Sequence, residues 1–353
     1  MRRLTYASVC SGIEAVSVAW QDLDLKPLWF SEIEPFPCAV LAHHYPDIPN
    51  YGDMTTLPDR ILSGEIETPD ILVGGTPCQA FSVAGLRNSL NDERGNLTLV
   101  FVRILNAINT IRRRHGLPDA VVLWENVPGV LSTRDNAFGC FLAALLGESK
   151  ELVPTGGRWT GAGIVRSDEC EIAWRILDAQ YFGVPQRRRR VFLVAGSRNR
   201  RIAEILFERP GESRDFKKGK TSEKESSAFV ESSFGTYRES DVGGTVKRTG
   251  GALSGGSETL IVNIGATLST GFGGRGVDSD QICNGNCVIN SQKVRKLTPV
   301  ECERLQGFPD NYTRIPWRNK PAEQCPDTPR YMAIGNSMAV PVMRWIGERV
   351  CKA

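Results

Sequence analysis

The sequence is poor in histidine and contains no long hydrophobic run. Its 353 residues include only three histidines, His43, His44 and His115, and apolar stretches such as Ala120–Trp124 are far too short to cross a bilayer. The segment Met1–Tyr6 leads straight into a strand-like run and has no cleavable signal pattern. We therefore expect a cytoplasmic chain without a membrane span.

Ten cysteines are present, but they are scattered along the chain. In a cytoplasmic protein this spacing favours reduced thiols over a disulfide framework. Cys283 and Cys287 form a Cys-x3-Cys pair that could suggest zinc, but no histidine lies near them, and we expect no metal.

The net charge of +3 says little by itself, but the basic residues are clustered. Arg112–Arg114, Arg187–Arg190, Arg198–Arg201 and Lys217–Lys220 could each be a solvated face, which is the usual role of a charge run. Several clusters around one region would instead suit the phosphate backbone of a nucleic acid.

Residues 1 to about 196 alternate short apolar runs with amphipathic ones, which is typical of a doubly wound α/β sheet. Helical spacing runs from Leu97 to Ile108, and Pro154–Gly163 predicts an inserted loop or hairpin. The expected strands are Tyr6–Val9, Leu28–Ser31, Ile71–Gly74, Val121–Trp124, Ala173–Leu177 and Val191–Ala195.

The region from about 198 to 292 is crowded with Gly, Ser and Thr and lacks helical periodicity. Short β-prone pieces such as Thr259–Ile264 favour a small, loop-rich β lobe with a mobile segment at Glu212–Ser227, and a disordered linker is the alternative. After it, Thr298, Pro299 and Glu301 predict a helix opened by a capping box, and a last helix is expected over Val340–Val350.

Three segments carry groups suited to chemistry. Asp70–Ser82 is a buried strand followed by glycines and a proline, which place Cys78 at the carboxyl end of a strand, where α/β sheets bind ligands. A small buried hydrophobe is the alternative for this cysteine. Val121–Pro128 delivers Glu125 and Asn126 to a strand end in the same way, and Gln186–Arg190 precedes a strand with alternate side chains on one side.

These segments resemble the conserved motifs of the cytosine-5 DNA methyltransferases, in the family's order and spacing. Pro77-Cys78-Gln79, Glu125-Asn126-Val127, Gln186-x-Arg188-x-Arg190 and Gly335-Asn336-Ser337 are similar to motifs IV, VI, VIII and X; Asn91–Leu97 and Arg295–Pro309 are similar to motifs V and IX. The resemblance covers nearly the whole chain outside the Gly-rich lobe.

The resemblance implies methyl transfer from S-adenosylmethionine to C5 of a cytosine. Cys78 would add to C6 as a thiolate, Glu125 would hold or protonate N3, and Arg190 would grip the base carbonyl. Arg188 would support the cysteine and the phosphates, and the surrounding arginines would favour the thiolate. A cytosine inside a base stack cannot react in this way, so the base must be flipped out.

The resemblance also implies a donor site in the first half of the chain. The segment Ser8–Ala15 is similar to motif I but departs from the family's Phe-x-Gly-x-Gly, because Cys10 replaces the aromatic residue and Glu14 the second glycine. Glu32 suits the ribose hydroxyls, and Asp53 suits the adenine amine, with a plain helix N-cap as its alternative. The implied donor-binding set is Ser11, Gly12, Ile13, Glu32, Ile33, Asp53, Met54, Pro77, Leu97, Asn336 and Ser337.

The implied partner is double-stranded DNA, contacted by Gln79, Ser82, Gln186, Thr267 and Leu268, and a nucleoid-associated monomer is expected. Thr267-Leu268-Ser269 resembles the family's short Thr-Leu element, which positions backbone and does not reveal the sequence that is read. We expect a catalytic domain over 1–196, completed by 328–353, and a target-recognition domain over 197–327.

There are three alternatives. A tRNA cytosine methyltransferase of the same fold would carry a Cys-Phe-Thr tripeptide, which this sequence lacks, and the other class of RNA cytosine-5 enzymes places a Thr-Cys pair where this chain has Glu125-Asn126. A catalytically inactive DNA-binding protein would not need Cys78, Glu125 and Arg190 together.

Overall fold

The computed structural model describes residues 3–77, 97–208 and 297–353, together with the backbone of five strands between 226 and 296. The chain divides into two compact units. The first comprises Met1–Leu177, Arg189–Arg214 and Arg344–Ala353, and the second Asp178–Arg188 and Asp215–Met343. The predicted functional boundaries, which assign 328–353 to the catalytic domain, stay a prediction.

A seven-stranded mixed sheet forms the centre of the first unit, in the order β2-β1-β3-β4-β7-β6-β5. The four strands β2, β1, β3 and β4 are parallel, and β7 runs antiparallel to β4. Their bounds are β1 Leu4–Val9, β2 Leu25–Ser31, β3 Ile71–Gly74, β4 Val121–Asn126, β5 Ala162–Arg166, β6 Cys170–Asp178 and β7 Arg189–Ser197. All six predicted strands are therefore confirmed, and β5 with β6 forms the hairpin expected near Pro154–Gly163.

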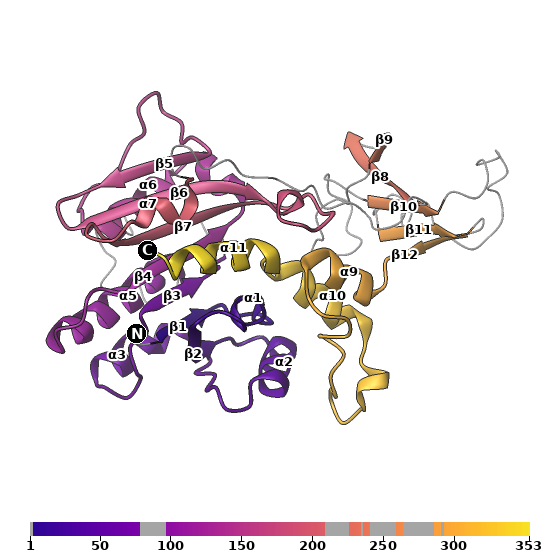
Figure 1. Cartoon of the computed structure of the whole chain (residues 1–353), viewed down its shortest axis with the longest axis horizontal. Coiled ribbons are helices and arrows are strands. Elements are labelled where there is room, and N and C mark those ends of the chain that lie inside the picture. The colour runs from indigo at the N-terminus through magenta and orange to yellow at the C-terminus, as the bar shows by residue number, and fades with distance from the viewer. Residues whose placement is uncertain are drawn as a thin grey trace. The chain divides into compact units, whose positions relative to one another are not determined.

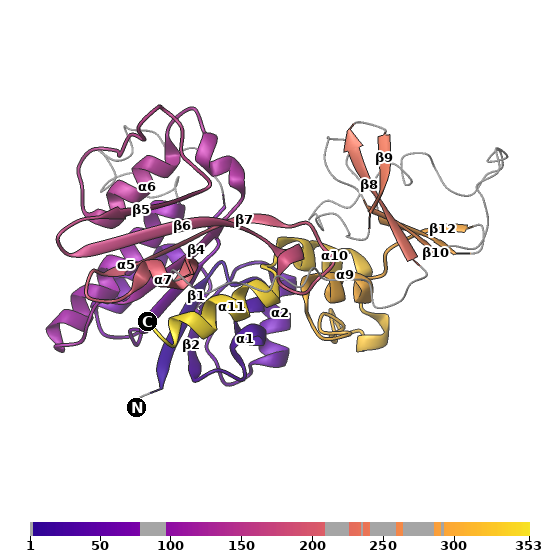
Figure 2. The same ribbon diagram turned by 45° about the horizontal axis from the view of Figure 1, so that its top comes forward.

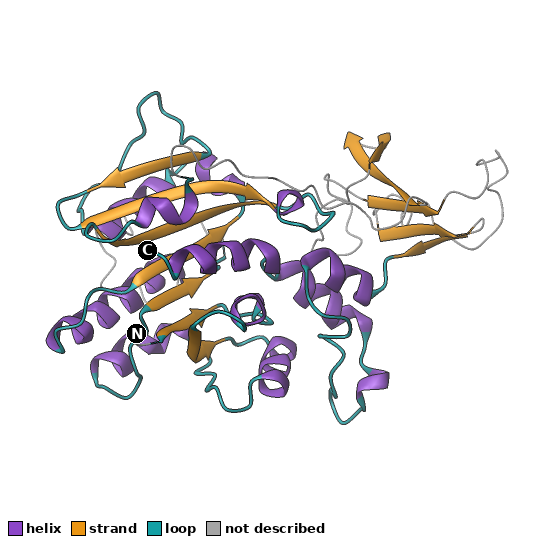
Figure 3. Cartoon of the chain, in the orientation of Figure 1, coloured by secondary structure: helices purple, strands orange, loops and turns teal. Residues whose placement is uncertain are grey.

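Helices cover both faces of this sheet (Figure 3). Alternate β1 residues face opposite sides, so Ala7 and Val9 pack under α5 and α3 while Tyr6 meets Trp20 of α1 edge to face at 4.9 Å. On the side of α1, α11 lies between α1 and α7, because Gly347 abuts Trp20 and Arg349 donates to backbone carbonyls at the end of α7 (Figure 1). The helices are α1 Ala15–Trp20, α2 Pro35–His44, α3 Leu57–Leu62, α5 Leu97–Arg114, α6 Ala137–Leu146, α7 Ile202–Leu206 and α11 Val340–Val350, which begins in the second unit. The short 3₁₀ turns η1 Met54–Thr56 and η2 Pro128–Ser132 belong to the first unit, and η3 Ala179–Tyr181 to the second.

The second unit contains a five-stranded sheet (Figure 2), and its strands follow the order β12-β11-β10-β8-β9. This sheet confirms the predicted β lobe and contradicts the disordered linker, although most of Glu212–Ser227 lies outside the described residues. Its strands are β8 Ser226–Ser233, β9 Thr236–Ser240, β10 Thr259–Asn263, β11 Asn286–Asn290 and β12 Lys293–Lys296.

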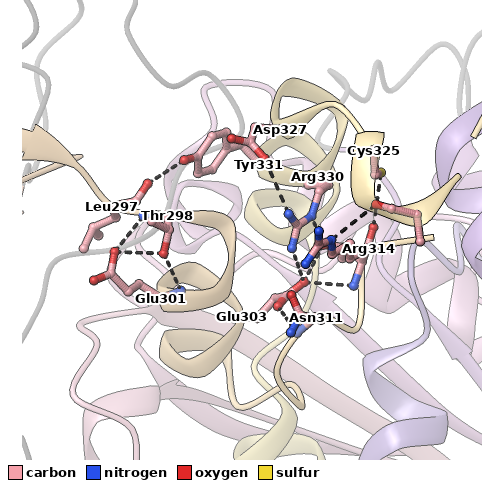
Figure 4. A network of polar contacts seen from close by, with 12 residues as sticks. Leu297, Thr298, Glu301, Glu303, Asn311, Arg314, Cys325, Asp327, Arg330 and Tyr331 are labelled. Atoms are coloured by element: carbon pink, nitrogen blue, oxygen red, sulfur yellow. Dashed lines mark hydrogen bonds and ion pairs between the residues drawn. The ribbon is translucent and has the colours of Figure 1, made fainter. Parts of the chain in front are cut away.

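Helix α9 (Pro299–Gln306) begins with the predicted capping box, since Thr298 accepts from the Glu301 backbone and Glu301 accepts from the Thr298 backbone. The fully buried Glu303 joins α9 to α10 (Asp327–Asn336) because its carboxylate accepts from the backbone of Asn311, at 2.7 Å, and from Arg330, at 3.3 Å (Figure 4). The short turn η4 (Ala322–Gln324) lies between these helices in sequence.

No helix in the described part of the chain is both long and apolar enough to span a membrane. Within the same residues, no three His, Cys, Asp or Glu side chains gather as a metal site would require. Cys283 lies outside this part of the chain.

Candidate active site

The predicted site residues of the first unit gather at one edge of its sheet. Because β1, β2, β3 and β4 are parallel, their carboxyl ends lie at this edge, and the chain leaves them at Cys10, Glu32, Gly75 and Val127. The structure therefore brings together the segments that resemble motifs I and VI, with the end of β3 that leads to Pro77.

The turn after β1 has a backbone that favours glycine at Gly12, where φ is +58°. Ser11 is fixed to the end of β2, since its backbone N–H donates to the Ser31 carbonyl at 3.2 Å. Ile13 is fully buried, and its contact with a donor molecule stays a prediction. Burial raises the pKa of the Cys10 thiol to about 12, and the charge of Glu32 adds to this effect, so Cys10 stays a neutral thiol.

Glu32 is buried and its carboxylate is oriented by backbone donors. One oxygen accepts from Gly12 N–H at 2.7 Å, and the other accepts from Ile33 and Glu34 N–H at 2.9 and 2.8 Å. The side-chain amide of Asn50 makes two hydrogen bonds to the Glu32 backbone. Its oxygen accepts from the Glu32 N–H at 2.9 Å, and its nitrogen donates to the Glu32 carbonyl at 3.1 Å. Ile33 beside it is 68% exposed, which leaves its apolar side chain accessible to a ligand.

Asp53 is a helix N-cap, which was the alternative to a contact with the adenine amine. It is exposed and caps η1 by accepting from the Thr55 N–H at 2.9 Å. Met54, the next residue, is buried with its sulfur 3.7 Å from the Cys10 thiol. A contact between Asp53 and the adenine amine stays a prediction.

The segment that leads to the predicted nucleophile is held in place by β4. Thr76 is buried; its hydroxyl contacts the Thr98 hydroxyl and accepts from the Trp124 indole N–H, both at 2.9 Å. The Asn126 amide donates to the Thr76 carbonyl at 3.0 Å. Pro77 follows and is exposed, while Cys78, Gln79 and Ser82 lie outside the described residues.

Glu125 and Arg190 meet on neighbouring strands. In the antiparallel pairing of β4 and β7, Asn126 lies opposite Val191, and the Arg190 Nε lies 3.2 Å from the Glu125 carboxylate. Their side chains are only 12% and 17% exposed, so the pair is poorly screened by water. Arg190 Nη1 donates to the Arg189 carbonyl at 2.8 Å, and Nη2 makes no hydrogen bond to the described residues.

Gln186 and Arg188, at the end of a segment of the second unit, are buried, whereas Arg187 and Arg189 are not, which confirms the predicted alternation. The Arg188 guanidinium donates to the Ser337 and Gly335 carbonyls at 2.6 and 3.2 Å. It therefore anchors the segment that resembles motif X, in which Asn336 is exposed and Ser337 buried. The predicted contacts of Arg188 with Cys78 and phosphates, and of Gln186 with DNA, stay predictions, and Thr267 and Leu268 lie outside the described residues.

Two basic clusters do not lie at the site edge. Arg112 is 1% exposed and is paired with Asp70, which precedes β3, at 2.8 Å. Arg198–Arg201 follow β7, whose carboxyl end lies beside the amino end of β4, since Ala195 pairs with Val122. Both clusters are therefore at the opposite edge of the sheet, and the interpretation of Arg112 as part of a phosphate-binding surface is wrong, because its charge is needed inside the fold.

Thr76, Asn50 and Trp124 were not predicted as site residues. Each acts on a predicted residue or its segment through hydrogen bonds between positions far apart in the sequence. Only Asn126, inside the Glu-Asn pair, carried a sequence signal.

Known proteins resemble this chain over most of its length. A family model described as C-5 cytosine-specific DNA methylase matches residues 4–150 and 165–352. A protein of Escherichia phage P1 named DNA N-6-adenine-methyltransferase is 41% identical over 467 aligned residues, which include all of this chain and 62% of that protein. The type II methyltransferase M.HpaII of Haemophilus parainfluenzae is 27% identical over 366 residues, covering 99% of this chain and 89% of the relative.

Solved structures show the same fold. The crystal structure of the S. pombe Dnmt2 methyltransferase matches with a TM-score of 0.61 at 16% identity, over 99% of both chains. The Spodoptera frugiperda DNMT2 mutant matches with a TM-score of 0.60 at 18% identity, again over 99% of both.

Proposed function

This chain belongs to the C-5 cytosine-specific DNA methylase family, and from that premise we propose that it transfers a methyl group from S-adenosylmethionine to C5 of a flipped-out cytosine in a specific double-stranded DNA sequence. The reaction would pass through a covalent bond between the Cys78 sulfur and C6 of the base. The observation that carries the proposal is the buried Glu125–Arg190 pair, one residue from the Asn126 side chain that holds Thr76.

The residues of the first unit fit the methyl donor. Glu32 offers an oriented carboxylate for the ribose hydroxyls, Ile33 offers an exposed apolar side chain for the adenine ring, and Asp53 offers an exposed carboxylate for the adenine amine. Ser11, Gly12 and Ile13 form the turn after β1, whose Gly12 N–H contacts Glu32, and Met54 follows Asp53 in sequence. Pro77, Leu97, Asn336 and Ser337 belong to the donor-binding set by resemblance alone. When bound, the donor supplies an electrophilic methyl group on a sulfonium sulfur.

The chain's own groups would do the rest. The Cys78 thiolate forms a bond to C6, and the electron pair released makes C5 nucleophilic. Glu125 holds N3 and its proton, while Arg190 fixes Glu125 through Nε and can turn Nη2 toward the base carbonyl. After C5 takes the methyl group it loses its proton, and the electrons of that C–H bond expel the Cys78 thiolate.

A second function is favoured by one observation, namely the name of the phage P1 relative, which specifies N6 of adenine. That chemistry transfers the methyl group directly to an exocyclic amine and has no use for a cysteine adduct.

One experiment separates the two functions. The purified chain is incubated with DNA and S-adenosylmethionine, and the nucleosides of the digested DNA are identified by mass spectrometry. We expect 5-methylcytosine, and N6-methyladenine alone would refute the proposal. DNA carrying 5-fluorocytosine should additionally trap the chain, because fluorine cannot leave as a cation, and the adduct should map to the peptide containing Cys78. An active preparation that never traps would refute the covalent route.

A further inference from the structure

The turn after β1 contains a buried carboxyl group at the position where the family has its second glycine. Glu14 has φ +59°, a left-handed backbone that an L side chain rarely adopts, and its side chain is 0% exposed. Cys10 and Gly12 of the same turn are also left-handed. A side chain kept in so unfavourable a place needs contacts that offset its cost.

The Glu14 carboxylate makes those contacts on both sides of the turn. One oxygen accepts from the Ser8 hydroxyl of β1 at 2.5 Å. The other accepts from the hydroxyl and the backbone N–H of Ser17 in α1, at 2.6 and 3.2 Å. Tyr6 extends the network, with its hydroxyl 2.8 Å from the Ser17 hydroxyl. Glu14 therefore ties the strand before the turn to the helix after it.

The same network reaches the residues proposed to bind the donor. The Ser8 hydroxyl lies 2.7 Å from that of Ser11, and the next residue, Gly12, donates its N–H to Glu32. A change at Glu14 can thus alter the orientation of the carboxylate proposed for the ribose. It has no direct route to Cys78 or Glu125 through the contacts described.

Glu14 has no cationic partner in the described part of the chain. No Arg, Lys or His there forms an ion pair with it, and the charged group that acts on it is Glu32. Burial raises the pKa of the Glu14 carboxyl to about 7, although hydrogen bonds from Ser17 and Ser8 lower it, and the charge of Glu32 raises it further.

We propose that Glu14 is a positioning residue for the methyl donor, which holds the Cys10–Ile13 turn in its binding shape and, when ionised, favours the positively charged donor. This inference rests on the proposed function. S-adenosylmethionine carries a sulfonium, an ammonium and a carboxylate and is a net cation, so ionised Glu14 should raise the affinity for it. Donor affinity should increase as the pH rises through about 7.

The test measures donor binding by titration calorimetry at pH 6, 7 and 8 on the full chain and on Glu14→Gln. The amide has the shape of the neutral acid and can keep the hydrogen bonds if the hydroxyls of Ser8 and Ser17 rotate. Relative to Glu14→Gln, the parent chain should bind about 2.5-fold more tightly at pH 8 than at pH 6, if binding lowers the Glu14 pKa by about half a unit. Any effect of the donor's own titration on its affinity is the same for both proteins, so it cancels in the ratio of their affinities.

Kinetics and two further variants complete the test. Glu14→Gln should raise KM for the donor with little change in kcat. Ser17→Ala removes a hydrogen bond that lowers the Glu14 pKa, so it should move the pH midpoint upward, which a purely structural role would not do. Asp47→Asn, which removes an exposed charge, is the control and should match the parent.

Identical pH profiles for the parent and Glu14→Gln would overturn the inference, as would a loss confined to kcat. Thermal melting shows whether each variant is folded, and should Glu14→Gln fail to fold, Ser17→Ala decides the matter by its midpoint. If the parent chain methylates no cytosine, the proposed function fails, whereas the binding titrations still decide the role of Glu14.

Discussion

Replacing Asn126 by aspartate should slow the attack of Cys78 while leaving the donor site intact. The Asn126 side chain is buried and makes two hydrogen bonds: its amide nitrogen donates to the Thr76 carbonyl at 3.0 Å, and its oxygen accepts from the Val127 N–H at 2.8 Å. Asn126→Asp keeps the second and removes the first, because a carboxylate oxygen cannot donate. Thr76 lies two residues before Cys78, so the loss falls on the segment that positions the nucleophile.

The size of the effect follows from the burial of Thr76, which is 2% exposed. A buried carbonyl that loses its donor costs about 1–3 kcal/mol. If between half and all of this appears as misplacement of Cys78 in the transition state, methyl transfer should slow by about 2- to 140-fold, at about 1.4 kcal/mol per factor of ten.

The assay is single-turnover methylation at saturating donor, combined with calorimetric titration of the donor and thermal melting. Trp124→Phe is the matched variant, since it removes the indole N–H to the Thr76 hydroxyl, together with part of the buried indole, and keeps a ring packed against Phe141, whose centroid is 4.6 Å away. It should slow transfer in the same direction but less. If Asn126→Asp is folded and methylates at the parent rate, or loses donor affinity instead, Asn126 does not position the nucleophile.

The other predictions concern the nucleophile, the recognition lobe and the fold. Cys78→Ser should abolish methylation, measured with labelled donor, while DNA and donor binding persist; substantial turnover would exclude this nucleophile. Exchange of residues 198–292 for the matching lobe of a relative should change the methylated sequence, read by methylation sequencing, without changing the reaction; a folded hybrid that keeps the original target would place specificity elsewhere. Asp70→Asn should lower the free energy of unfolding by about 3–5 kcal/mol at pH 7, because it leaves Arg112 buried without its anion. Burial raises the Asp70 pKa, but hydrogen bonds from Thr5 and the Arg112 guanidinium outweigh it and lower that pKa, so the stability from Asp70 is present above about pH 4 and lost as the pH falls through the lowered value. Denaturant titrations should show a weaker acid dependence in Asp70→Asn, and equal acid dependence in both proteins would contradict this account.

The local sequence was sufficient for the elements and for the kind of chemistry. Short apolar runs ending in glycine or polar residues predicted six strands of the large sheet, and Thr298, Pro299 and Glu301 predicted the start of α9, because these signals act within a few residues. The parallel sheet then made it foreseeable that Glu32 and Glu125 would share one edge, since both follow the carboxyl ends of parallel strands.

The tertiary structure determines which of those residues form ion pairs and hydrogen bonds with one another. A run of three arginines does not show that Arg112 is buried against Asp70 whereas Arg113 is largely exposed, because that depends on where the end of α5 meets the start of β3. The same holds for Glu14. In the sequence it only replaces a glycine of the family's motif, whereas in the fold its buried carboxylate accepts hydrogen bonds from Ser8 of β1 and Ser17 of α1. A carboxylate is stabilised or strained by its neighbours in space, and those neighbours are set by packing between segments distant in the chain.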